Sequence, residues 1–314
     1  MKGLQTIQMN KLSELQYIEH KNIDSEKWNR CIDNSPNCRI YGYNWHLDRT
    51  AIVWDALVWG DYEFVMPLPY RKKWGVKYFY QPLFSQQLGI FPNPTETIKE
   101  NFYTELLKHS KYSDFQINSE NSASSNQSDI NFSVRENYLL PLNQDYRLLS
   151  KSFSKNTKRN LAKANKNKLS LVQGIRLEEY LEFKQDNLVA SLDKKDFASL
   201  KSLIAFGQYK GFGEIYGVYS ENNKLVSAVY FCRWKDRVIY MNAASNKLGK
   251  ELRGMYFIVD KFIRNHATEN ITLDFEGSMI PGVARFYHGF GATPETYFQL
   301  KFNRLPLPLK WLKR

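Results

Sequence analysis

Apolar and polar residues alternate along this chain in patterns that predict short strands and helices in both halves. In the first half, runs rich in Val, Phe and Tyr predict strands. A helix is predicted over Thr95–His109, where apolar residues recur at helical spacing after a capping threonine. The predicted strands are Asp55–Trp59, Glu63–Leu68, Lys77–Tyr80 and Asp114–Asn118. The second half repeats this order, with strands at Ile215–Tyr219, Leu225–Arg233, Arg237–Ala243 and Ile271–Glu276 and a helix over Met255–His266.

Matching residue pairs keep one offset between the halves. Leu88-Gly89 corresponds to Leu248-Gly249, and Asn118-Ser119 corresponds to Gly277-Ser278, each about 160 residues further on. Solenoid repeats have periods of roughly 20–50 residues, so this longer period predicts two copies of one α/β unit. We expect the first unit to span residues 1–145 and the second to span residues 146–314.

Composition narrows the class of protein. The 314 residues are 43% hydrophobic, which is enough for large cores and excludes a mainly disordered chain. No apolar stretch approaches the roughly 20 residues of a membrane-spanning helix. The amino terminus lacks the apolar core of a secretory signal, and the three cysteines form no close pair. These features predict a cytoplasmic protein with reduced thiols.

The net charge of +12 is concentrated in one segment. Residues 151–168 contain seven Lys or Arg and no acid, and Ser154 is placed to cap a helix that begins at Lys155. Four of the basic residues recur at three- and four-residue spacing and would form one stripe: Lys155, Arg159, Lys163 and Lys166. The stripe is typical of a surface for the phosphates of a nucleotide, an RNA or an anionic lipid. A solvated Lys-rich helix is the alternative, and charge alone leaves both open.

Standard catalytic motifs are absent from the sequence. It has no G-x-S-x-G, no H-E-x-x-H and no P-loop, and its five histidines lie at no metal-ligand spacing. We therefore expect no metal site.

The segment from Ile271 to Leu300 carries the most chemical information. Alternation along a strand would place Asp274 and Glu276 on one face, and Pro281 is suited to begin a helix after the Gly277-Ser278 break. A carboxylate at a strand end, facing a helix amino terminus, is a common position for a reacting group. The alternatives are that Asp274 is a structural cap, and that Glu276 is a buried charge paired with Arg253 or Arg285.

Three segments resemble the GNAT acyltransferase superfamily, and within it the FemABX-like branch with two GNAT units in tandem. Residues 154–160, SKNTKRN, are similar to the basic helix that opens the second unit of that branch. Residues 274–278, DFEGS, resemble its strand end, and residues 284–292, ARFYHGFGA, resemble the GNAT helix and turn. The resemblance implies an α/β (α+β) fold of two tandem GNAT-like units, each a mixed, mostly antiparallel sheet flanked by helices.

The resemblance also implies a reaction, the transfer of an acyl or aminoacyl group to an amine. The donor would be acyl-CoA or aminoacyl-tRNA, and the acceptor a small molecule or a peptidoglycan precursor. Tyr287 matches the tyrosine that protonates the leaving group in many GNAT enzymes, and Glu276 is the candidate base. The candidate binding residues are Lys155, Lys158, Arg159, Arg253, Gly254, Ser278 and Arg285.

The sequence departs from the GNAT pattern at the cofactor loop, residues 248–255. Only Gly254 lies at the start of the predicted helix, so fewer backbone N–H groups are free to hold a pyrophosphate. This departure favours a donor bulkier than acetyl-CoA, such as aminoacyl-tRNA. The alternative function is a catalytically degenerate GNAT-like protein that binds RNA, a nucleotide or another polyanion.

Overall fold

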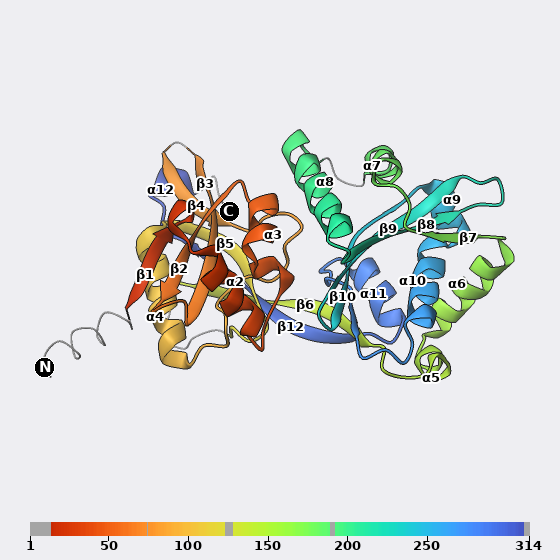
Figure 1. Cartoon of the computed structure of the whole chain (residues 1–314), viewed down its shortest axis with the longest axis horizontal. Coiled ribbons are helices and arrows are strands. Elements are labelled where there is room, and N and C mark those ends of the chain that lie inside the picture. Colours follow the sequence, from red (N-terminus) through yellow and green to blue (C-terminus); the bar gives the residue numbers. More distant parts are fainter. Residues whose placement is uncertain (1–13, 74, 123–127, 189–191, 311–314) are drawn as a thin grey trace, which may run out of the picture. The chain divides into compact units, whose positions relative to one another are not determined.

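The computed structural model of the chain describes residues 14–73, 75–122, 128–188 and 192–310. The chain forms two compact units (Figure 1). Unit 1 comprises residues 1–135 and 296–314, and unit 2 comprises residues 136–295.

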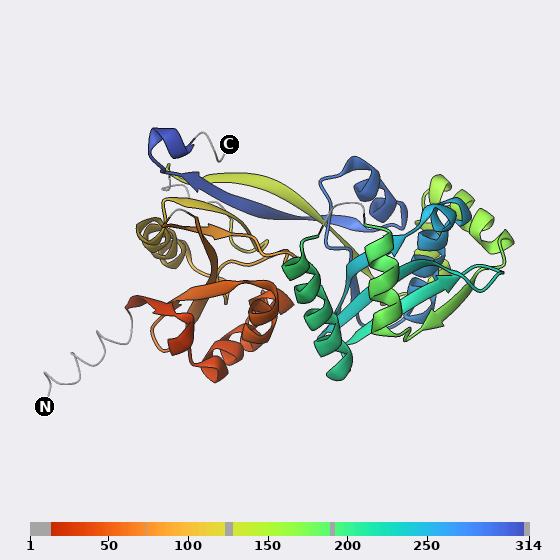
Figure 2. The same cartoon turned by 90° about the horizontal axis from the view of Figure 1, so that it is seen from above.

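Unit 1 is a mostly antiparallel sheet with strand order β1-β2-β3-β4-β5-β12, in which only β4 and β5 run parallel. Helices α2 and α3 pack on one face of this sheet and α4 on the other (Figures 1 and 2). The strands are β1 (Leu15–Glu19), β2 (Val53–Trp59), β3 (Phe64–Lys73), β4 (Val76–Tyr80), β5 (Tyr112–Ile117) and β12 (Thr293–Asn303). The helices are α2 (Ser25–Asn34), α3 (Asn44–Thr50), α4 (Glu96–His109) and the terminal α12 (Leu307–Lys310).

Unit 2 has the same arrangement, with strand order β7-β8-β9-β10-β11-β6 and one parallel pair, β10 with β11. Helices α7 and α8 cover one face, and α10, α6 and α11 the other (Figure 1). The strands are β6 (Asn131–Pro141), β7 (Ser170–Gln173), β8 (Gly213–Tyr219), β9 (Leu225–Trp234), β10 (Arg237–Ser245) and β11 (Thr272–Asp274). The helices are α5 (Tyr146–Lys151), α6 (Lys155–Lys166), α7 (Leu177–Asp186), α8 (Lys194–Tyr209), α9 (Lys247–Leu252), α10 (Gly254–Asn265) and α11 (Pro281–Gly289).

Each half of the sequence ends in a strand that pairs in the other unit. Strand β6 follows β5 in sequence, yet its residues 139–141 pair with β11 of unit 2. Strand β12 follows β11 in sequence, yet its residues 298–303 pair with β5 of unit 1. The expected division into 1–145 and 146–314 follows the order of the sequence repeat, whereas the compact units divide the chain within β6 and β12 because of this exchange.

Strands β10 and β11 separate after a short parallel contact. Their pairing covers only Arg237–Ile239 against Thr272–Asp274, and β10 then continues alongside β9 to Ser245 with a bulge at Met241. Behind this point Tyr240, Phe275 and Tyr287 pack as one aromatic group, with Phe275 and Tyr287 stacked at 4.7 Å between ring centroids. From Tyr240 onward, β10 is paired with β9 and no longer with β11.

A buried ion network fixes the chain where β11 ends. Arg237 on β10 donates to Asp274 Oδ2 at 2.6 Å and lies 3.5 Å from Glu295. Asn137 of β6 donates to Asp274 Oδ1 at 3.0 Å. Although burial lowers the pKa of Arg237, the charges of Asp274 and Glu295 raise it above its usual value. The network joins four strands, β6, β10, β11 and β12.

The same network corrects the predicted strand Ile271–Glu276. Strand β11 ends at Asp274, whose Oδ1 also accepts the backbone N–H of Glu276 at 2.9 Å. Glu276 and Gly277 then adopt left-handed backbone angles, with φ of +54° and +60°. Asp274 and Glu276 therefore do not share one face of a strand. The arginine partner of Asp274 is Arg237, which the sequence analysis did not single out.

We predict that Asp274→Ala destabilises the protein by about 3 kcal/mol, because it leaves Arg237, a charge whose side chain is 20% exposed, short of its main partner. Urea unfolding followed by circular dichroism measures this change in the free energy of unfolding. The control is Glu221→Gln, which removes the exposed ion pair between Glu221 and Lys168 and should change stability little. Equal changes in the free energy of unfolding would mean that the network at Asp274 stabilises the protein no more than an exposed ion pair does.

Candidate active site

Glu276 lies on the left-handed turn that leads from β11 to α11. Its neighbour Gly277 cannot be replaced without a clash, because a Cβ there would lie 2.1 Å from the Glu136 carbonyl oxygen. Ser278 accepts the backbone N–H of Ile280 at 3.0 Å and so shapes the entry to α11. Pro281 is the first residue of that helix, as predicted. The turn presents the half-buried carboxylate of Glu276 just before the helix begins.

Tyr287 lies on the buried side of α11, stacked on Phe275 and packed edge-on against Tyr240. Burial raises the pKa of Tyr287, and the negative charges of Glu276 and Asp274 raise it further. The phenol is thus protonated at neutral pH, as a proton donor must be. Phe275, on which the Tyr287 ring stacks, directly precedes Glu276 in the chain.

The backbone at the amino terminus of α10 lies in close contact with strand β9. Arg253 takes a left-handed conformation, with φ of +67°, between α9 and α10. A Cβ at Gly254 would lie 2.4 Å from Ser227 Oγ, so glycine is required for α10 to begin against β9. No side chain caps this helix, which leaves its first N–H groups directed toward any anion placed there.

Helix α6 carries the basic stripe on its exposed side. Ser154 caps the helix by accepting the N–H of Thr157 at 3.1 Å, which confirms the predicted start. Its buried side consists of Thr157, Asn160, Leu161 and Ala164, and every Lys and Arg of the helix is exposed. The carboxyl end of α6 lies beside the start of α10, because Asn167 donates to the Leu252 carbonyl oxygen at 3.1 Å.

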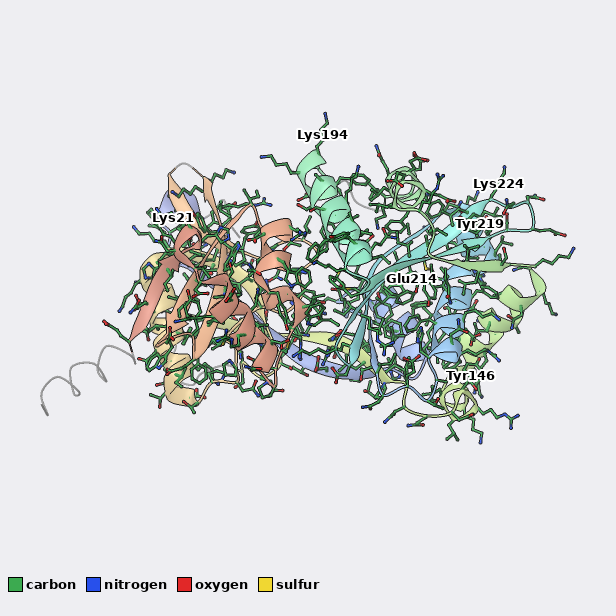
Figure 3. The ribbon with its side chains drawn as sticks, in the orientation of Figure 1. Lys21, Tyr146, Lys194, Glu214, Tyr219 and Lys224 are labelled. Carbon is green, nitrogen blue, oxygen red and sulfur yellow. The ribbon has the colours of Figure 1, made fainter. Side chains whose placement is uncertain are left out.

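The amino end of α6 contacts α11 instead. Ser154 donates its N–H to the Gly289 carbonyl oxygen at 2.9 Å. At the carboxyl end of α5, Lys151 supplies the carbonyl oxygen that accepts Lys158 Nζ. At the start of α5, Tyr146, which is labelled in Figure 3, donates its hydroxyl proton to Asp260 of α10 at 2.5 Å. Helix α6 therefore runs antiparallel to α10, and its two ends face different parts of the site.

The candidate residues fall into two groups. Glu276 and Ser278 lie on the turn after β11, and Tyr287 of α11 stacks on Phe275 beside that turn, whereas Arg253 and Gly254 lie at the start of α10. Lys155, Lys158 and Arg159 lie at the amino end of α6, away from Arg253, and Arg159 bonds locally to Asn156. Arg285 is exposed on α11, one helical turn before Gly289, which packs against Thr157 of α6.

Sequence reasoning left two features of the site out of the candidate set. Lys163 and Lys166 belong to the basic stripe but not to that set, although they lie at the end of α6 nearest to Arg253. Their helical spacing was the signal that could have selected them. Tyr240 and the bulge at Met241 were also missed, and nothing in the local sequence marks a bulge at that position.

Unit 1 has a parallel pair, β4 and β5, that corresponds to β10 and β11 of unit 2, and a segment of the chain itself lies beside the ends of these strands. After β4 the segment Leu88–Phe91 returns to the sheet, where Leu88 donates to Gln116 of β5 at 3.0 Å. Phe91 exchanges two backbone hydrogen bonds with Val65 of β3. In the described part of unit 2, no segment pairs in this way between β10 and the residues after Asp274. Among the residues that the structure describes, such a segment covers the strand ends in unit 1 and not in unit 2.

The described residues contain no group of three or more His, Cys, Asp or Glu side chains arranged to hold a metal ion. Within the same residues, the helices are too short or too polar to cross a bilayer.

Comparison with known proteins gives similarity in structure but not in sequence. No protein-family model matches the chain, and no curated protein sequence matches it either. Among solved structures, FemX superposes with a TM-score of 0.62 at 12% identity, over 96% of this chain and 99% of that chain. L-PGS from Bacillus licheniformis gives 0.55 at 11% identity, over 92% and 95%. A GNAT-family acetyltransferase from Colwellia psychrerythraea gives 0.53 at 12% identity, over 92% and 100%.

These three structures match almost their whole length, so the likeness covers both units rather than one. The superpositions establish the fold. At identities of 11–12% they do not establish the chemistry, which has to be argued from the site. The chain has a GNAT/FemABX-like fold.

Proposed function

We propose that the protein is an acyl or aminoacyl transferase whose active site lies in unit 2. The observation that carries the proposal is the stacking of Tyr287 on Phe275, the residue directly before Glu276, where β10 and β11 have diverged. Glu276 is a half-buried carboxylate, and Tyr287 is a buried phenol whose pKa is raised. The pair supplies a base and an acid at one place, as acyl transfer to an amine requires.

The proposed reaction moves two protons. The acceptor amine attacks the carbonyl carbon of the donor, and its proton passes to the Glu276 carboxylate directly or through one water. A tetrahedral intermediate forms, with negative charge on the former carbonyl oxygen. The bond to the leaving group then breaks, and Tyr287 gives its proton to the departing thiolate or ribose oxygen. The products are an amide and a free thiol or hydroxyl.

The donor is proposed to be phosphate-bearing, either acyl-CoA or aminoacyl-tRNA. Support comes from the uncapped start of α10 and from the cationic end of α6 that lies beside it. The stripe covers a 12-residue helix, about 18 Å long, so it can meet more phosphates than one pyrophosphate offers. Unit 2 is favoured over unit 1, because segment Leu88–Phe91 covers the matching place there.

The acceptor is proposed to be an amine of a small molecule or of a peptidoglycan precursor. Support for this class is the resemblance to the FemABX-like branch together with the superposition on FemX. The described residues contain no candidate metal group, and none of the proposed steps uses a metal ion.

We predict that Tyr287→Phe and Glu276→Gln each lower turnover by about 10²-fold or more, because each removes one partner in proton transfer. Turnover is measured as release of the acyl group from the donor in the presence of small amines. Matched controls are Tyr209→Phe, at an exposed tyrosine that ends α8, and Glu221→Gln on the β8–β9 turn. Wild-type rates in both site variants would remove these roles from Glu276 and Tyr287.

A thermal-shift comparison with coenzyme A, acetyl-CoA and aminoacylated tRNA tests donor binding. A ligand at 100 times its dissociation constant stabilises the folded protein by about 2.7 kcal/mol. We expect at least one of the three to raise the melting temperature of the wild type. We expect Lys163→Glu/Lys166→Glu to abolish that rise, because the charge reversal lies next to α10.

The control for this experiment is Lys201→Glu/Lys224→Glu, which makes the same change in net charge on α8 and the β8–β9 turn. It should keep the wild-type shift. An equal loss in both double variants would indicate general charge attraction instead of a local site. Salt-sensitive binding of tRNA without any acyl release would favour the alternative, a degenerate polyanion-binding protein.

A further inference from the structure

Helix α7 is attached to β10 just beyond the bulge by two side chains one helical turn apart. Tyr180 donates its hydroxyl proton to Asn242 Oδ1 at 2.6 Å, and Lys184 Nζ donates to the Ala243 carbonyl oxygen at 2.7 Å. A third contact holds the start of the helix, where Tyr219 of β8 donates to Glu179 at 2.5 Å (Figure 3). These contacts fix α7 against the stretch of β10 that has left β11.

Lys184 differs from the other two side chains because it brings a charge without a counter-charge. Among the described residues its single hydrogen bond goes to Ala243, and no carboxylate lies in ion-pair contact with it. Burial lowers the pKa of Lys184. An ammonium group has three N–H donors, so two remain after the bond to Ala243. A partly buried, unpaired charge is unfavourable unless a partner of opposite sign is supplied.

The position of this charge connects it with the candidate active site. Ala243 lies three residues after Tyr240 on β10, and Tyr240 packs against both Tyr287 and Phe275. The side chain of Tyr240 belongs to the core beneath α10, whereas Lys184 approaches the strand from the α7 face. Lys184 thus contacts β10 from the face of the sheet opposite to Tyr287, three residues beyond Tyr240.

We propose that Lys184 binds an oxygen anion of the substrate and positions the donor along β10. This inference rests on the proposed function, because it assigns a donor site between β10 and the end of β11. The oxygen anion has two possible sources, a carboxylate or phosphate that the substrate already carries, or the oxyanion that develops on the reacting carbonyl. A lysine is suited to either, as a compact charge on a flexible stem.

The test compares three variants with the wild-type full chain. Lys184→Met removes the charge at similar length, Lys184→Arg keeps the charge, and Tyr180→Phe removes the neighbouring hydrogen bond without changing charge. Each is studied by thermal shift with coenzyme A, acetyl-CoA and aminoacylated tRNA, and by acyl release from the donor that shifts the wild type. The melting temperature without ligand shows whether each variant is folded.

Two results would support the proposal and separate the two sources. If Lys184→Met loses the ligand-induced shift, and Lys184→Arg and Tyr180→Phe keep most of it, then Lys184 binds an anion that the substrate already carries. If Lys184→Met keeps the shift but loses about 10²-fold or more in acyl release, and Lys184→Arg recovers part of it, then the anion is the developing oxyanion.

Three results would overturn it. Wild-type shift and turnover in Lys184→Met would show that the charge is not used. An equal loss in Lys184→Met and Tyr180→Phe would show that the attachment of α7 matters and the charge does not. A wild type that responds to none of the three donors would remove the proposed function and, with it, this inference. In contrast, a responding wild type with an unaffected Lys184→Met variant would remove the inference alone.

Discussion

The geometry of the candidate active site depends on the buried ion pair between Arg237 and Asp274. The Asp274 carboxylate accepts hydrogen bonds from the Arg237 guanidinium, from the Asn137 amide and from the backbone N–H of Glu276. These bonds join the start of β10, the middle of β6 and the turn after β11. Because the desolvated charges are satisfied only when all three segments are in place, the pair favours one arrangement of the turn over its alternatives. Asp274 therefore holds the turn on which Glu276 lies.

Under the proposed function, the opposite charges of unit 2 would serve different parts of one reaction. Asp274 is buried and Glu276 is half-buried, and burial together with these two negative charges raises the pKa of Tyr287. The basic residues of α6 lie outside on an exposed helix, where salt screens them. An incoming polyanion would meet the exposed cations first, and the less screened interior groups would act on its reacting end. The arrangement resembles electrostatic steering toward a preformed site.

Local sequence patterns were sufficient for most elements and insufficient for the site. The caps at Thr95 and Ser154 and the proline at position 281 act within one helical turn, so the sequence predicts them correctly. The pairing of Arg237 with Asp274 spans 37 positions and needs the parallel contact of β10 and β11, which periodicity does not reveal. The left-handed turn at Glu276 was missed because the residues before it continue a strand-like pattern. The bulge at Met241 and the attachment of α7 through Lys184 arise from tertiary packing alone.

The exchange of β6 and β12 sets an order for folding during synthesis. The sheet of unit 1 lacks its last strand until residues 298–303 have been made, nearly the whole chain after β1. Strand β5 must then remain without its neighbour on that side while all of unit 2 is translated. Contacts of such sequence separation slow folding, and an unpaired strand edge is a surface on which other chains can associate. The amino-terminal half therefore reaches its final fold only after the carboxyl-terminal half has left the ribosome.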